Sequence, residues 1–191
     1  MQKRYITLST VEQLYFSGCA GCQNSCCDGS RFIFLPLILD DFEEVYSYFP
    51  IVFTLIQEEW RALILMANEN SSCHYYQDGY CTIYEHRPPG CRIYPINPYY
   101  NDILIDTSCH AVNTKEGLFL ASKEEINSSF YHKRLDNFEI KRQRSEDYLK
   151  QLQEGFELIG EIAEMKLYQY SGEENDHYIT MHRKSLKMLK V

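Results

Sequence analysis

The chain has 191 residues, and its 19 Lys and Arg against 27 Asp and Glu give a formal net charge of −8. This length allows one domain with a sizeable hydrophobic core, and the acidic balance of residues 1–109 argues against a nucleic-acid-binding surface there. Because there is no long apolar run and no signal-peptide pattern, we expect a cytoplasmic protein without a membrane span.

The predicted secondary structure changes in character near residue 112. Before that point, short apolar segments and turn signals predict strands at 30–37, 61–68 and 102–106 and a short helix at 40–49. After it, apolar residues spaced three and four apart predict one face of a helix, formed by Leu149, Leu152, Phe156, Ile159 and Ala163.

These elements predict an α+β fold. We expect a small cysteine-rich metal-binding module at residues 1–112, with a helical C-terminal extension at 113–191 packed on it. Tyrosines are frequent between residues 75 and 100, and we expect them to pack or to shield the cysteines from water, because aromatic rings bury a large area with few rotamers.

All eight cysteines lie between residues 19 and 109. Cysteines clustered in this way, in a chain without an export signal, are more often metal ligands than disulfides. Cys19 and Cys22 have the spacing from which a tight turn presents two sulfurs to one ion. Cys26 and Cys27 are adjacent, so we do not expect both to face one centre easily, and which of them is a ligand stays open.

The second group has four members with irregular spacing: Cys73, Cys81, Cys91 and Cys109. Taken alone, the spacing of these cysteines favours small apolar side chains in a core, and the first group is what makes ligands of them. Arg87 and Arg92 lie close to Cys91, where a guanidinium would balance the charge of thiolate ligands or hold an anionic ligand. His74 and His110, each directly after a cysteine, are alternative ligands or exposed neighbours.

Two segments carry a family pattern. They are the first cysteine group, residues 19–27, and the segment CTIYEHRPPGCRIYP at 81–95. Both resemble the YkgJ-like cysteine-cluster family of zinc- or iron-chelating CxxCxxCC domains. This chain has one more residue before its cysteine pair than that pattern, a spacing that also resembles flagellin lysine N-methylases. Those relatives use S-adenosylmethionine and carry an iron–sulfur cluster, so the resemblance implies a metal site and leaves the activity open.

Three hypotheses follow from the cysteines and the resemblance. In the first, the protein binds a 4Fe-4S cluster or zinc, and the favoured group is the cluster. The ligands are drawn from all eight cysteines, Cys19, Cys22, Cys26, Cys27, Cys73, Cys81, Cys91 and Cys109. In the second, the protein is a metal-dependent enzyme that modifies a protein or peptide, such as a lysine N-methyltransferase using S-adenosylmethionine. In the third, the metal is structural zinc and the C-terminal helix docks a protein partner.

Overall fold

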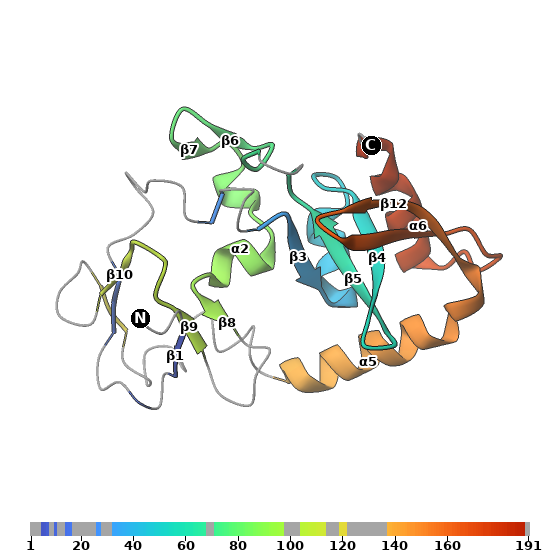
Figure 1. Cartoon of the computed structure of the whole chain (residues 1–191), viewed down its shortest axis with the longest axis horizontal. Coiled ribbons are helices and arrows are strands. Elements are labelled where there is room, and N and C mark those ends of the chain that lie inside the picture. The colour runs from blue at the N-terminus through green and yellow to red at the C-terminus, as the bar shows by residue number, and fades with distance from the viewer. Residues whose placement is uncertain are drawn as a thin grey trace.

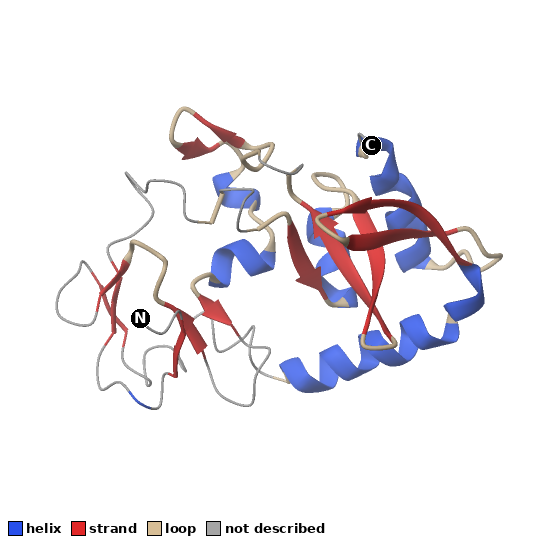
Figure 2. Cartoon of the chain, viewed as in Figure 1, coloured by secondary structure: helices blue, strands red, loops and turns tan. Residues whose placement is uncertain are grey.

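The computed structural model describes residues 5–7, 10, 14–16, 26–27, 32–67, 71–97, 104–113, 119–121 and 137–189. These residues form both helices and antiparallel sheets, which confirms the α+β prediction (Figures 1 and 2). None of the described helices is long and apolar enough to cross a membrane. Cys19 and Cys22 lie outside the described residues.

The largest sheet has five antiparallel strands in the order β12–β13–β4–β5–β3. The strands are β3 (Phe34–Leu37), β4 (Ile51–Ile56), β5 (Glu59–Leu65), β12 (Phe156–Ile162) and β13 (Met165–Tyr170). In the view of Figure 1, helix α5 (Phe138–Gln151) runs below this sheet and α6 (His177–Ser185) lies on its right. The apolar segments of β4 and β5 are buried because helices and neighbouring strands cover them.

The main core lies between this sheet and the helices. Phe42 of the short helix α1 (Phe42–Val45), Phe53 of β4 and Ile179 of α6 are completely buried there. Two buried serine hydroxyls join the helices to the core. Ser145 Oγ of α5 accepts Leu39 N–H at 3.0 Å, and Ser185 Oγ of α6 accepts Ile51 N–H of β4 at 2.8 Å. Burial of these apolar side chains is the main stabilising contribution to this part of the molecule.

The remaining described elements are short. Strands β1 (Tyr5–Thr7), β9 (Leu104–Asp106) and β8 (Ile96–Asn97) form one sheet, and β10 (Val112–Asn113), β2 (Leu14–Phe16) and β11 (Phe119–Ala121) form another. A hairpin joins β6 (Tyr76–Gln77) to β7 (Tyr80–Cys81), and helix α2 (Pro89–Ile93) follows it. The short 3-10 turns are η2 (Leu39–Asp41), η3 (Tyr84–His86), η4 (Gln153–Gly155) and η5 (Leu186–Met188).

Four of the predicted elements are confirmed with shorter or shifted bounds. The strands expected at 30–37, 61–68 and 102–106 correspond to β3, β5 and β9, and the helix expected at 40–49 corresponds to η2 and α1. Strand β4, at the centre of the largest sheet, was missed. Its turn to β5 consists of Gln57 and Glu58, with φ of 51° and 66°. Such a hairpin turn usually contains Gly or Asn, and their absence leaves little signal in the sequence.

The prediction of a helix through Phe156, Ile159 and Ala163 is wrong. Helix α5 ends at Gln151, and Phe156–Ile162 forms strand β12, which pairs with β13. The apolar spacing of three and four therefore arose in an edge strand, where pairing with a neighbour outweighed the local pattern.

The prediction of a helical C-terminal extension is wrong for strands β12 and β13, which form a hairpin. Strand β13 pairs with β4 at Tyr168 and Phe53, so the largest sheet combines strands from both sides of residue 112. The division of the chain at residues 112 and 113 stays a prediction.

Candidate metal centre

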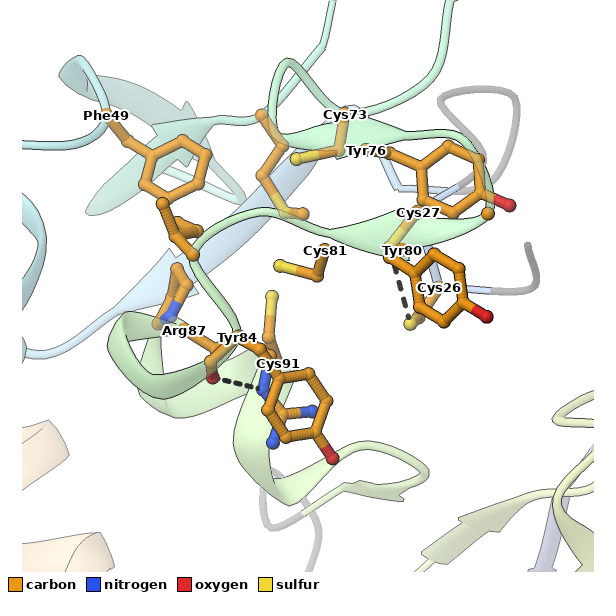
Figure 3. Close-up of a pocket in the computed structure, with 14 residues that line it drawn as sticks. Cys26, Cys27, Phe49, Cys73, Tyr76, Tyr80, Cys81, Tyr84, Arg87 and Cys91 are labelled. Atoms are coloured by element: carbon orange, nitrogen blue, oxygen red, sulfur yellow. Dashed lines mark hydrogen bonds between the residues drawn. The ribbon is translucent and has the colours of Figure 1, made fainter. Parts of the chain in front are cut away.

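A cavity of about 230 Å³ lies where the β6–β7 hairpin, helix α2 and the Cys26–Cys27 segment meet. Five cysteines line it, Cys26, Cys27, Cys73, Cys81 and Cys91. In Figure 3, the side chains of Cys73, Cys81 and Cys91 point into the same space from three different segments. The structure therefore brings together five of the eight cysteines that the sequence singled out.

Backbone hydrogen bonds join the Cys26–Cys27 segment to the β6–β7 hairpin, and the two strands of the hairpin to each other. Cys73 N–H donates to the carbonyl oxygen of Cys27 at 2.8 Å, which joins the adjacent cysteine pair to the start of the hairpin. The hairpin then reverses at Asp78 and Gly79, with φ of 48° and 86°, a conformation for which an Asp-Gly turn is well suited. This reversal pairs Tyr76 with Cys81 and returns a second thiol to the cavity.

Aromatic contacts fix the hairpin to the core. The hydroxyl of Tyr75 donates to the carbonyl oxygen of Tyr48 at 2.9 Å, and the Tyr75 ring meets Phe49 edge to face at 5.1 Å. His86 stacks on Tyr48 with ring centroids 5.6 Å apart. Rings packed in this way hold the hairpin against the core beside the cavity, so the positions of the cysteines do not depend on the thiols alone.

Helix α2 supplies Cys91. Pro89 occupies its first turn, where a missing N–H costs no hydrogen bond. A Cβ added at Gly90 would lie 3.3 Å from Leu35 Cδ1, so glycine lets this helix approach strand β3 closely. Cys91, the next residue of the same short helix, lines the cavity.

The adjacent cysteines lie closer to one another than the sequence led us to expect. The Sγ atoms of Cys26 and Cys27 are 3.9 Å apart, and both residues line the cavity. Two sulfurs on one tetrahedral zinc ion, with Zn–S bonds of about 2.3 Å, are about 3.8 Å apart. The pair therefore has the sulfur separation of two ligands of one ion, and which of the two cysteines is a ligand stays a prediction.

The five thiols are spread around the cavity. Among the described residues, no three Cys, His, Asp or Glu side chains are gathered closely enough to hold a single metal ion as they stand. Within the lining, the Sγ atoms of Cys26 and Cys27 form a hydrogen bond at 3.9 Å. The donor set is nevertheless chemically suited to zinc and to iron, which thiolate sulfur binds strongly.

Burial and mutual proximity set the protonation of these thiols. The hydrogen bond from the Cys27 side chain lowers the pKa of Cys26 to about 7, and the same bond, together with burial, raises the pKa of Cys27. Burial also raises the pKa of Cys73 and of Cys91, and their thiol neighbours add to both shifts. Several thiolates cannot coexist in so small a volume without a positive charge, which a bound metal would supply.

The two predicted arginines have different environments. Arg87 lines the cavity: its Nε donates to the carbonyl oxygen of Tyr84 at 2.9 Å, and its guanidinium lies 3.6 Å from the centroid of the Tyr84 ring. This charge acts to lower the pKa of Cys26 and Cys91. Arg92 instead forms an ion pair with Glu44 and is not among the lining residues.

The other candidate ligands lie elsewhere. Cys109 is buried in the turn after β9, where its N–H donates to Asp106 O at 3.2 Å, and it does not line the cavity. His74 and His110 are also absent from the lining. Sequence reasoning missed several lining residues whose apolar side chains gave no signal of a site, among them Phe49, Met66, Ile83 and Pro88. Tyr76, Tyr80 and Tyr84 belong to the lining, and their predicted role in shielding the thiols stays a prediction.

Comparison with known proteins identifies the family. No curated protein and no solved structure gives a significant match to the chain. A family model matches residues 18–134, well over half of the chain, and this range contains all eight cysteines. The chain belongs to the CxxCxxCC family, described as a putative zinc- or iron-chelating domain.

Proposed function

We propose that this protein holds an iron–sulfur cluster or a zinc ion in the thiol cavity. The observation that carries this proposal is the meeting of five thiols from three separate parts of the chain around one space. Thiols that only fill a core would be expected to scatter among other apolar side chains. Cys19, Cys22 and Cys109 stay predicted ligands, the first two because they lie outside the described residues.

The chemistry of the lining supports this proposal. Thiolates are soft ligands that suit zinc and iron–sulfur clusters, and the apolar side chains of Phe49, Met66 and Ile83 in the lining would limit access of water to the inner sulfurs. Arg87 would balance part of the negative charge that four thiolates leave around the metal. When bound, the metal would supply the positive charge that the thiolates need, and in a cluster also a one-electron redox function.

We favour the cluster over zinc. A single zinc ion needs four sulfurs gathered within about 3.8 Å of one another, because each Zn–S bond is about 2.3 Å long. Among the described cysteines, Cys26 and Cys27 approach to 3.9 Å, while the other thiols surround a cavity of about 230 Å³. Thiols spread around such a space favour an iron–sulfur cluster, which is wider than a single zinc ion.

The remaining parts of the proposal come from the sequence. They are the YkgJ-like label, the relation to flagellin lysine N-methylases, a cytoplasmic location and the division into a metal-binding module and a C-terminal extension. A methyltransferase alternative would place S-adenosylmethionine near the cavity, and a binding assay with S-adenosylmethionine tests it. The docking alternative now concerns α5, along which Arg142 forms ion pairs with Glu139 and Glu146. Glu146 also pairs with Arg61 of strand β5.

The decisive experiment is anaerobic purification followed by measurement of zinc, iron and acid-labile sulfide, together with a visible spectrum. We expect iron and sulfide, and a visible absorbance that bleaches on reduction. Tightly bound zinc without sulfide would replace the cluster with zinc. A protein with neither metal would contradict the proposal.

Matched cysteine variants locate the centre. Cys81→Ser removes a thiol that lines the cavity, and we expect it to lower the metal content well below that of the wild type. Cys109→Ser removes a buried thiol outside the lining, and it serves as the comparison. Equal metal loss in both variants would show that the cavity alone does not define the centre, and full retention in Cys81→Ser would overturn its assignment.

A further inference from the structure

The thiol cavity reaches the surface on one side. Tyr80 and Tyr84, which belong to its lining, are 67% and 46% exposed, whereas Cys73 at its inner end is 7% exposed. Large exposed aromatic side chains at the edge of a cavity are typical of a surface that meets a ligand. The outer part of the cavity is therefore accessible to a molecule from solution.

Arg87 is the one cation among the described residues that line this cavity. Its Nε is used by Tyr84 O, and its guanidinium is stacked on the Tyr84 ring, at the same end of the cavity as Cys91 (Figure 3). Within the described part of the chain, Arg87 makes no ion pair, whereas Arg92 is paired with Glu44. The guanidinium is thus held in place with its outer N–H groups available, an arrangement that matches a carboxylate.

The rest of the lining is mainly apolar. Phe49, Met66, Ile83 and Pro88 form part of the wall, and the rings of Tyr80 and Tyr84 are its exposed part. Binding sites for small molecules commonly combine such apolar walls with a few polar groups that fix the orientation of the ligand. One fixed cation beside apolar walls selects an anionic group attached to an apolar body, and flat rings stack well on tyrosine.

Building on the metal centre proposed above, we propose that the outer cavity binds a small aromatic carboxylate. The carboxylate is held by Arg87, and the ring packs against Tyr80 and Tyr84. Such a ligand would lie next to the thiols, so the centre would be open to a substrate or an external ligand, in contrast to a closed structural site.

The test uses the protein as purified without oxygen, with its zinc and iron content measured first. Benzoate is titrated by calorimetry at fixed ionic strength, and benzamide, a neutral molecule of the same shape, is titrated in parallel. We expect benzoate to bind at least about tenfold more tightly than benzamide, because a charge-assisted hydrogen bond to Arg87 is lost with the amide.

Three variants separate the charge of Arg87 from its shape and from the general charge of the surface. Arg87→Gln is expected to weaken benzoate binding by about tenfold or more, and Arg87→Lys to weaken it less, because Lys keeps the charge without the planar fork. Arg92→Gln removes a nearby cation outside the lining and should leave benzoate binding unchanged. Circular dichroism confirms that each variant is folded.

The outcomes distinguish this inference from the metal centre. A protein that contains metal but binds benzoate no better than benzamide, or that loses equal affinity in Arg87→Gln and Arg92→Gln, overturns the carboxylate site and leaves the centre in place. A protein without zinc or iron that still binds benzoate through Arg87 overturns the centre and keeps the carboxylate site. Absence of benzoate binding overturns the inference.

Discussion

The five-stranded sheet and the thiol cavity are held together in different ways. In the sheet, long segments of β4 and β5 are buried, and α5 and α6 contribute further apolar side chains to the same core. The elements around the cavity are a hairpin whose strands β6 and β7 have two residues each, the 3-10 turn η3 and the five-residue helix α2. Elements this short are not stable alone, so they depend on anchoring contacts and, when present, on a metal.

We therefore expect the sheet to be the more stable region and to position the elements around the cavity. Two residues connect the regions: Tyr75 hydrogen-bonds to Tyr48, and Gly90 lets α2 approach Leu35. Sites that exchange a ligand or a metal are commonly built from segments of low local stability on a rigid support. The following predictions test whether the two regions behave separately.

The largest effect is expected in the core of the sheet. Phe53 is completely buried, with its ring 5.0 Å from Phe156 and 4.6 Å from His182. Phe53→Ala should lower the free energy of unfolding by about 4 kcal/mol, since it removes a large side chain and leaves a cavity. Denaturant unfolding followed by circular dichroism measures this change. Leu158→Ala, at a position 58% exposed on β12, is the control and should have little effect.

The metal content of Phe53→Ala and Leu158→Ala shows whether the sheet only supports the cavity. If the sheet only supports the cavity, the folded fraction of Phe53→Ala should hold as much metal as the wild type. Loss of metal from protein that is still folded would show that the core sets the thiol positions directly.

Acid should weaken the sheet through one buried histidine. His182 Nε2 accepts the N–H of Tyr170 at 3.0 Å, so the neutral ring carries its proton on Nδ1 and donates it to Ile51 O at 2.9 Å. Burial lowers the pKa of His182 from 6.5 to about 4. The unfolded chain therefore binds more protons than the folded one between these values, and stability falls as the pH falls from 6.5 to 4.

The loss amounts to about 3 kcal/mol over this range, because each pKa unit corresponds to about 1.4 kcal/mol. Unfolding by denaturant at a series of pH values measures it. His182→Gln should be less stable at neutral pH but should show a flatter pH profile, whereas His177→Gln, at an exposed position in the same helix, should keep the wild-type profile. An unchanged slope in His182→Gln would assign the acid sensitivity to other groups.

Metal removal is expected to affect mainly the cavity region. After treatment with a chelator, amide exchange should accelerate by about tenfold or more at Cys73, which donates to Cys27 O, and at Thr82, which donates to Tyr75 O. The amides of β4 and β5 should keep their protection. Hydrogen exchange followed by mass spectrometry or NMR distinguishes the regions, and uniform acceleration would show that they unfold as one unit.

The smallest effect is expected at a hairpin turn of the sheet. Ala163 and Glu164 connect β12 to β13 with φ of 50° and 63°, a region that side chains other than glycine adopt at a cost. Glu164→Gly should raise the free energy of unfolding by about 1 kcal/mol. Glu161→Gly, inside strand β12, is the matched control and should be destabilising. A lower stability for Glu164→Gly would mean that flexibility of the unfolded chain outweighs relief of strain.

Local pattern accounts for the elements that the sequence predicted well. Strands β3 and β5 are short apolar runs, and the short helix α1 has acidic residues in its first turn; these signals are visible within a few residues, although Pro36 lies inside β3 and does not end it. The β4–β5 and β12–β13 hairpins were not predicted, because their turns, Gln57–Glu58 and Ala163–Glu164, lack the residues typical of hairpin turns. The helix predicted through Phe156 and Ile159 was wrong for a different reason. Their spacing favours a helix, and strand β12 accommodates it with a register shift between Leu158 and Gly160 that only the pairing with β13 shows.

The chemistry of this protein is visible in its amino-acid sequence: many thiols, an arginine beside them and a family pattern that covers them. Which of these groups share a space became known from the folded chain. Cys27 meets Cys73 through a backbone hydrogen bond between residues 46 positions apart, and Arg87 lines the cavity while Arg92 is paired with Glu44. The physical reason is that a ligand set is a long-range property, fixed by strand pairing and core packing, whereas sequence spacing reports only on neighbours along the chain.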